Sequence, residues 1–205
     1  EARADEGRVA VFGRDLARLR PRSIALLRRQ LGIVPQDLRL IPDRSALHNV
    51  ALALELQRAP RRHARARAAD VLADVGFPAG LRTRAGRLSP GEQQLVAIAR
   101  ALVREPPLLI MDQPTAHLDG AATSALVALL AGRTALVASN DGELLAAAAY
   151  RGWRIVELRD GMLRTVDATP AAVEVAGMID TGGDVPLEIA NVVPFPVSAR
   201  AGGTE

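Results

Sequence analysis

Short apolar runs alternate with longer amphipathic segments along most of the chain. Continuous hydrophobic stretches at 31–35, 108–112 and 134–138 predict buried strands, because strands covered on both faces lack polar alternation. Apolar residues at helical spacing predict helices at 21–30, 45–57, 61–75, 89–104, 123–130 and 144–150. Buried strands that alternate with helices predict an α/β sandwich around a parallel sheet.

The two ends of the chain carry weaker patterns. Residues 8–12 alternate in polarity and predict a short strand. Residues 153–158 and 162–166 flank an Asp-Gly turn, which predicts a β-hairpin. A further helix is expected at 169–176. From residue 181 onward, abundant Gly and Pro without any period predict a flexible tail.

The composition narrows the functional classes. The chain has 205 residues, of which 49% are hydrophobic and 24% charged, as expected for a globular domain. All 26 basic residues are arginine, which explains a pI of about 10.7 beside a net charge of only +3. Because acidic and basic residues are mixed and aromatic residues make up only 2%, we expect no nucleic-acid partner.

Metal-cluster and membrane-spanning classes are also disfavoured. The chain has no cysteine and its three histidines are far apart in the sequence, so neither disulfides nor a thiolate or histidine metal cluster is expected. No apolar run approaches the roughly 18 residues of a membrane span. No signal peptide is evident, and the cytoplasm is the expected compartment.

Three motifs follow one another in the chain. Residues 88–94 read Leu-Ser-Pro-Gly-Glu-Gln-Gln, and residues 108–119 read Leu-Leu-Ile-Met-Asp-Gln-Pro-Thr-Ala-His-Leu-Asp. Gln36 follows a Gly-Ile-Val-Pro stretch. These segments resemble the LSGGQ signature, the Walker B and D-loop pattern and the Q-loop of ABC ATPases. Because their order and separation also match, the chain is identified as a member of that family.

The resemblance implies a fold and a division into domains. It runs from about Gly7 to Val166 and implies a P-loop NTPase-like ABC ATPase sandwich, here without its N-terminal Walker A strand, loop and helix. The ATP-binding domain is expected at 1–168, with a helical subdomain at about 37–92. Residues 169–205 are expected to form a C-terminal helix and a flexible tail.

The resemblance also implies ATP and Mg²⁺ as ligands. It assigns nucleotide contacts to Gln36, Ser89, Gly91, Glu92, Gln93, Asp112 and Asp119, with Asp112 and Gln36 in the Mg²⁺ shell. In the family the signature lies at a helix N-terminus, where free N–H donors and the positive dipole end attract anions. It reaches across a dimer to the nucleotide of a second ATP-binding subunit.

The sequence departs from the family pattern at both positions that carry chemistry. Gln113 replaces a glutamate that polarises water. An amide cannot accept a proton at neutral pH, so general-base help worth about 10²–10⁴-fold is lost. Asn140 replaces a histidine. The phosphate-binding G-x-x-x-x-G-K loop does not occur in these 205 residues, which contain no lysine. We expect weak ATP binding and poor or no hydrolysis by the chain alone.

The missing loop has two explanations. The sequence starts at Glu1 rather than Met, so the block that carries the loop either lies upstream or has been lost. A fragment of an active enzyme is expected to keep the glutamate and the histidine, so we favour a degenerate subunit. The alternatives are an active ATPase whose first block lies upstream, and a non-hydrolysing interaction module that binds a membrane partner.

Within the family, residues 28–42 and 45–52 look most like the cell-division ATP-binding type, FtsE. Lipoprotein-release and macrolide-export ATPases share much of this pattern. The FtsE resemblance implies an integral membrane partner, an FtsX-like permease, contacted by the Gln36 region and the helices between 45 and 86. It also implies a second ATP-binding subunit, in a homodimer or heterodimer, and a peripheral position on the inner face of the cell membrane.

Overall fold

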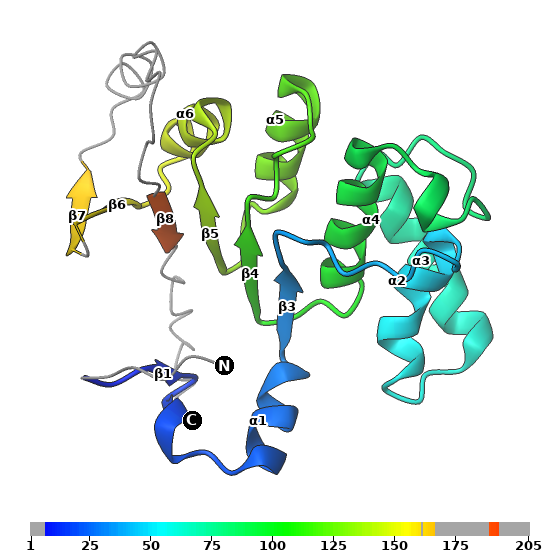
Figure 1. Ribbon diagram of the computed structural model, residues 1–205, viewed down its shortest axis with the longest axis horizontal. Coiled ribbons are helices and arrows are strands. Elements are labelled where there is room, and N and C mark those ends of the chain that lie inside the picture. Colours follow the sequence, from blue (N-terminus) through cyan, green and yellow to red (C-terminus); the bar gives the residue numbers. More distant parts are fainter. Residues whose placement is uncertain (1–6, 161, 167–188, 193–205) are drawn as a thin grey trace, which may run out of the picture.

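A six-stranded sheet forms the centre of the computed structural model, which describes residues 7–160, 162–166 and 189–192 (Figure 1). The strands lie in the order β3-β4-β5-β8-β6-β7. In that order their bounds are Leu31–Val34, Leu108–Asp112, Ala135–Ser139, Ile189–Val192, Ile155–Arg159 and Met162–Val166. A separate hairpin pairs β1 (Ala10–Val11) with β2 (Arg14–Asp15).

The strands β3, β4 and β5 run parallel to one another. Val34 lies opposite Met111, and Asp112 lies opposite Ala138, so the three carboxyl ends reach the same edge of the sheet. The side chains of Val34, Met111 and Val137 are at most 1% exposed. Burial of such side chains stabilises the fold by roughly 1.5–3 kcal/mol each, which explains why these runs are continuously apolar.

Helices cover the sheet and extend the molecule beyond β3 (Figure 1). They are α1 (Pro21–Arg28), α2 (Ala46–Glu55), α3 (Arg61–Asp74), α4 (Pro90–Leu102), α5 (Gly120–Leu129) and α6 (Gly142–Tyr150). Short 3-10 turns occupy Leu16–Arg18 and Ala85–Arg87. The helices α2, α3 and α4 contact one another and form a helical end beside β3.

Close contact between α4 and β3 depends on a glycine. A Cβ atom on Gly32 would lie 2.6 Å from the carbonyl oxygen of Ala101, so only a residue without a side chain fits there. This contact fixes α4 against the strand that leads to Gln36.

The arginine-rich helix α3 is anchored by a narrow apolar stripe. Its buried residues Ala64, Ala68, Val71 and Leu72 recur at helical spacing and are at most 3% exposed. The arginines of the helix lie on its other faces, so its charge does not prevent packing against α2 and α4.

The α/β arrangement and the hairpin of β6 with β7 are confirmed. The single strand predicted at 8–12 is wrong in extent, because the chain turns back at Phe12 and Gly13, where φ is +50° and +73°. The flexible tail predicted from residue 181 is wrong at Ile189–Val192, which pair antiparallel with both β5 and β6. The helix predicted at 169–176 lies outside the described residues.

Candidate functional site

Three polar segments meet where the parallel strands end. Gln36 follows β3, Asp112 closes β4, and Asn140 follows β5. Their side chains are exposed at this edge. In open α/β sheets the carboxyl edge of the strands is where ligands bind, so the sequence-predicted residues gather at a position suited to a ligand.

The two positions that depart from the family pattern contact each other. The Asn140 backbone N–H donates to Oε1 of Gln113 at 3.4 Å, and the Gln113 N–H donates to the Ala138 carbonyl at 2.8 Å. Gln113 has φ +48°, a left-handed conformation that costs a non-glycine residue free energy. These bonds hold the amide beside Asn140, where it accepts hydrogen bonds but cannot serve as a general base.

The signature segment forms a fully capped helix start. The Ser89 Oγ accepts from the Glu92 N–H at 3.3 Å, and the Glu92 carboxylate accepts from the Ser89 N–H at 2.8 Å. This reciprocal pair is a capping box, as the Ser-x-x-Glu spacing predicts. The Ser89 and Glu92 side chains therefore already accept hydrogen bonds from the backbone at the start of the helix, without any ligand.

The first turn of α4 keeps one backbone donor for an anion. Pro90 has no N–H, and the N–H groups of Glu92 and Gln93 donate to the side chain and carbonyl of Ser89. This leaves the N–H of Gly91 as the donor that remains in the described first turn. A Cβ atom on Gly91 would lie 2.7 Å from the His117 carbonyl oxygen, so the glycine also permits close packing on the loop after β4.

Gln36 and Gln93 line one hollow of about 320 Å³. Gln93 donates through Nε2 to the Leu88 carbonyl at 2.9 Å, which fixes its side chain at the rim. His117 lines the same hollow, although sequence analysis gave this histidine no role. His117 is far from Gln36 in the sequence, so no sequence pattern indicated that the two residues line one hollow. Their proximity depends on the packing of Gly91 against the His117 backbone.

Asp119 acts as a helix cap. Its Oδ1 accepts from the Ala122 N–H at 2.8 Å at the start of α5. The cap satisfies one of the free donors at this helix start. The position is exposed, so the nucleotide contact implied by the resemblance stays a prediction for this carboxylate.

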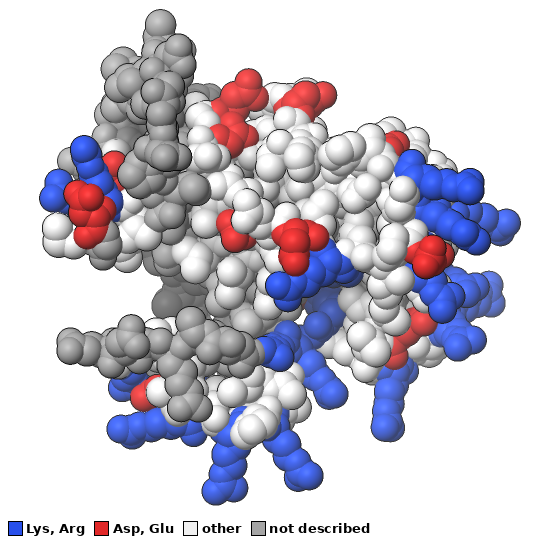
Figure 2. Space-filling model, viewed as in Figure 1, with Lys and Arg blue, Asp and Glu red and all other residues white. Residues whose placement is uncertain are grey.

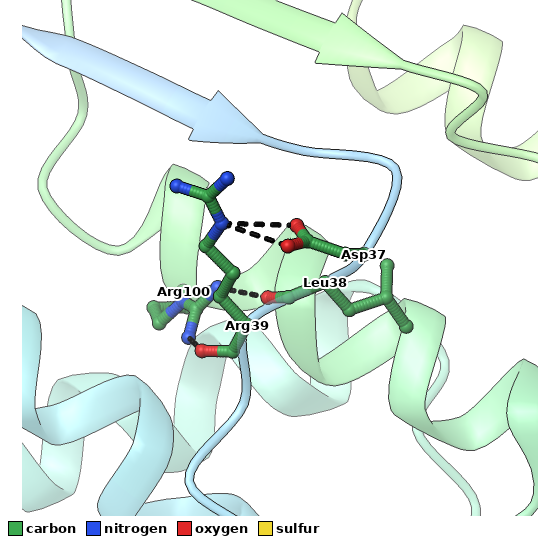
Figure 3. A network of polar contacts seen from close by, with 4 residues as sticks. All are labelled: Asp37, Leu38, Arg39 and Arg100. Carbon is green, nitrogen blue, oxygen red and sulfur yellow. Dashed lines mark hydrogen bonds and ion pairs between the residues drawn. The ribbon is translucent and has the colours of Figure 1, made fainter.

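A strained segment follows Gln36 and is held by an arginine from α4 (Figure 3). Leu38 and Arg39 both have left-handed backbones, with φ of +53° and +47°. Arg100 donates to the Leu38 carbonyl at 2.5 Å and to the Arg39 carbonyl at 2.7 Å. Arg39 in turn pairs with Asp37 at 2.9 Å. Burial lowers the pKa of Arg100, and the charge of Asp37 opposes that shift.

The donor set at the strand edge fits Mg²⁺ only together with phosphate. Within the described residues, no group of three or more acidic, histidine or cysteine side chains could enclose a metal. Magnesium is commonly held by one or two carboxylates plus substrate phosphates, and Asp112 with Gln36, which follows the neighbouring strand β3, provides such a partial set. The residues thus fit a nucleotide-bound metal rather than a metal held by protein alone.

Comparison with known proteins identifies the class. The family described as ABC transporter matches residues 1–116, more than half of the 205 residues. The chain therefore belongs to the ABC transporter family. This confirms the resemblance drawn from the three motifs and the ABC ATPase type of fold.

Two curated relatives show which kinds of ABC ATP-binding protein this chain resembles. The chain is similar to the cell division ATP-binding protein FtsE of Streptococcus pneumoniae, with 36% identity over 71% of this chain and 65% of the relative. It thus spans about two thirds of that protein's length. The lipoprotein-releasing system ATP-binding protein LolD 2 of Caulobacter vibrioides is 40% identical over 78% of this chain and 72% of its own length.

A solved structure shares the fold. The ATP-binding cassette MJ0796, in a dimeric post-hydrolysis state bound to ADP and Pi, matches with a TM-score of 0.70 and 30% identity. The match covers 80% of this chain and 75% of that cassette.

Among the described residues, no helix combines the length and hydrophobicity that crossing a bilayer requires.

Proposed function

We propose that this chain is an ATP-binding subunit of an ABC transporter-type membrane complex and that it contributes little to hydrolysis itself. The contact between Gln113 and Asn140 carries this proposal. It lies at the strand edge beside Asp112, where the family resemblance places the reacting phosphate. An amide there can orient water or phosphate but cannot remove a proton at neutral pH.

The signature helix supports a role toward a second subunit. Ser89 and Glu92 are committed to the capping box, so the Gly91 N–H and the positive end of α4 are what remains for an anion. Gly91, together with the dipole, would contact the terminal phosphate of a nucleotide that an intact subunit holds. The solved cassette that resembles this chain is dimeric, which is consistent with such a composite site.

A role in cell division is the particular function we favour. One relative with 36% identity is an FtsE, and residues 28–42 and 45–52 carried the FtsE resemblance in the sequence. We propose an FtsX-like permease as the membrane partner, contacted through the Gln36 region and the helices α2 and α3, on the inner face of the cell membrane. The 40% identical lipoprotein-releasing relative makes lipoprotein release the second candidate.

Photo-labelling tests whether the chain completes a nucleotide site. The tagged chain would be purified from its own host with its natural partners and irradiated with ATP that carries a photoreactive azidoanilide on its γ-phosphate, beside the isolated chain. We expect labelling of this chain within the complex and very weak labelling of the isolated chain. In a Gly91→Ala variant the new Cβ would press on the His117 carbonyl and displace the Gly91 N–H, so the signal in the complex should fall while co-purification of the partners persists.

An interaction module without a nucleotide role predicts a different pattern. In that case the complex forms, but this chain is labelled neither in the complex nor alone. Strong labelling of the isolated chain would contradict the proposed dependence on a second subunit. The Gln113→Glu, Asn140→His double variant adds a separate readout, because restored proton transfer should raise hydrolysis by the complex if this edge faces a nucleotide.

A further inference from the structure

The turn before α3 and the first half of that helix concentrate positive charge. Residues 56–69 contain five arginines and no acidic residue, although the whole chain has a net charge of only +3. Figure 2 shows basic side chains that project from the helical end of the molecule, where α3 lies. The five are Arg58, Arg61, Arg62, Arg65 and Arg67.

Only one of these five arginines is neutralised within the described part of the chain. Arg67 pairs with Glu105 at 2.5 Å, and its side chain is 32% exposed. The other four are exposed and form no ion pair with any described residue. We call these four the arginine patch: Arg58, Arg61, Arg62 and Arg65.

The charges of α3 are arranged against the dipole of the helix. Arg61 and Arg62 occupy the first turn, which has no acidic residue, and the N-cap Pro60 provides no side-chain cap. Asp74 is the last residue of the helix, and the last turn has no basic residue. Cations at the N-terminal end and anions at the C-terminal end of a helix both destabilise it. Arg61 and Arg65, one turn apart, add repulsion between like charges.

The requirements of the fold do not explain this arrangement. The opposite placement of the same charges would favour the helix, and the apolar stripe from Ala64 to Leu72 holds α3 in place despite them. Local choices that disagree with the stability of an element are expected at functional sites. The patch therefore indicates an anionic partner that neutralises it.

We propose that the arginine patch binds the anionic headgroups of the inner membrane leaflet while the subunit is held at its membrane partner. The inference rests on the proposed function, which places α2 and α3 toward the membrane. A guanidinium group matches the geometry of a phosphate and binds it through two hydrogen bonds. Every arginine near an anionic bilayer adds to the attraction, so four on one short segment favour reversible attachment.

The shape of the patch favours a headgroup layer over a protein segment. The four arginines extend from an exposed helix and its leading turn, and none lines the hollows of about 590 and 320 Å³. A helical protein segment is commonly bound in an apolar groove, whereas a raised basic surface can approach a flat layer of phosphates.

Vesicle flotation tests the proposal. The 205-residue chain would be mixed with vesicles of phosphatidylcholine alone or with vesicles that contain about one third phosphatidylglycerol. We expect binding to the anionic vesicles only, with release as NaCl rises from about 0.1 to 0.5 M. The patch variant should bind the anionic vesicles at least about tenfold more weakly. It carries Arg58→Gln, Arg61→Gln, Arg62→Gln and Arg65→Gln.

A charge-matched control lies at the opposite edge of the sheet, around β6 and β7. It changes four exposed arginines and should bind like the wild-type chain: Arg151→Gln, Arg154→Gln, Arg159→Gln and Arg164→Gln. Thermal melts would show that both variants are folded. The patch variant should melt no lower than the wild-type chain, because its substitutions remove unfavourable charges from the start of α3.

Three results of the vesicle assay would overturn the proposal. Equal weakening in both variants would show that binding follows net charge alone. Equal binding to neutral and anionic vesicles, or no binding at about 1 mM anionic lipid, would show that the patch does not recognise headgroups. Inorganic phosphate should displace the chain no better than chloride at the same ionic strength. Selective displacement by inorganic phosphate would identify a site for free phosphate instead of a bilayer.

An acidic protein segment is the competing occupant of the patch. The complex that contains the patch variant would be purified in detergent, where no bilayer is present, and should keep its partners. Loss of the partners would assign the arginines to a protein contact and overturn the proposal.

The vesicle assay contains neither nucleotide nor partner, so its failure is distinct from a failure of the proposed function. Photo-labelling in the complex can succeed while vesicle binding fails, and the reverse also holds. The two experiments therefore test the lipid contact and the nucleotide role separately.

Discussion

At the residue scale, close backbone contacts do much to shape the site. Gly91 brings the start of α4 against the loop that carries His117, and Gly32 brings the other end of that helix against β3. Arg100 joins the same helix to the carbonyls of the segment after Gln36. Single substitutions at these positions should therefore disturb the strand edge and the segment after Gln36 through packing.

Gly91→Ala should destabilise the fold by about 1–3 kcal/mol, the usual cost of overpacking. Its new Cβ atom would lie 2.7 Å from the His117 carbonyl oxygen, and backbone gives way less easily than a flexible side chain. Urea denaturation measures the effect. Gly80→Ala is the matched control, because its Cβ atom would approach Thr83 only to 3.5 Å. Equal stability of both variants would refute the packing role.

Arg100→Met should free the segment that follows Gln36. The Leu38 and Arg39 carbonyls would lose a charged donor, which costs about 1–3 kcal/mol. The lower end applies because the bond to Arg39 is exposed and the bond to Leu38 is only partly buried. We expect faster hydrogen exchange at residues 37–40 together with a lower urea midpoint. Arg62→Met, on the exposed side of α3, should change neither quantity. Unaltered exchange in Arg100→Met would show that Arg100 does not hold this segment.

At the element scale, the parallel strands and the surrounding helices follow from local pattern. The runs that became β3, β4 and β5 are short, apolar and flanked by turn residues, and the Ser-x-x-Glu spacing fixed the start of α4. Strand β8 could not be predicted this way. Residues 189–192 have no distinctive period, and their strand geometry comes from hydrogen bonds to β5 and β6.

A proline in β8 tests this pairing. Ala190 lies opposite Ala138 on β5 and Val156 on β6, so Ala190→Pro places a residue without an N–H between two strands. We expect lower stability and reduced amide protection in β5 and β6. Ala190→Val should preserve both, because valine is favoured in strands. Wild-type protection in the proline variant would show that β8 does not stabilise the sheet.

The sequence suggested which residues belong to the candidate site but not the contacts between them. The family resemblance singled out Gln36, Asp112 and Asn140, and the parallel strands bring their positions to one edge of the sheet. Three features depended on tertiary contacts: the hydrogen bond from Asn140 to Gln113, the left-handed backbones at Leu38 and Arg39, and the place of His117 beside Gln36. Left-handed backbone is uncommon in residues other than glycine, so their sequence gave no signal.

At the scale of the whole molecule, two surfaces divide the proposed work. In the proposed function, the strand edge and the α4 N-terminus would face a nucleotide, and the Gln36 region with α2 and α3 would face a membrane partner. The segment from Gln36 to Arg39 leaves the strand edge toward α2, and Arg100 holds it through the Leu38 and Arg39 carbonyls.

Calorimetric titration of ATP–Mg²⁺ into these 205 residues tests the central claim most directly. The account predicts a dissociation constant weaker than about 100 μM, because the chain has no lysine for a phosphate-binding loop and one free donor in the described first turn of α4. A submicromolar dissociation constant would show that this polypeptide holds triphosphate on its own, and would contradict the account.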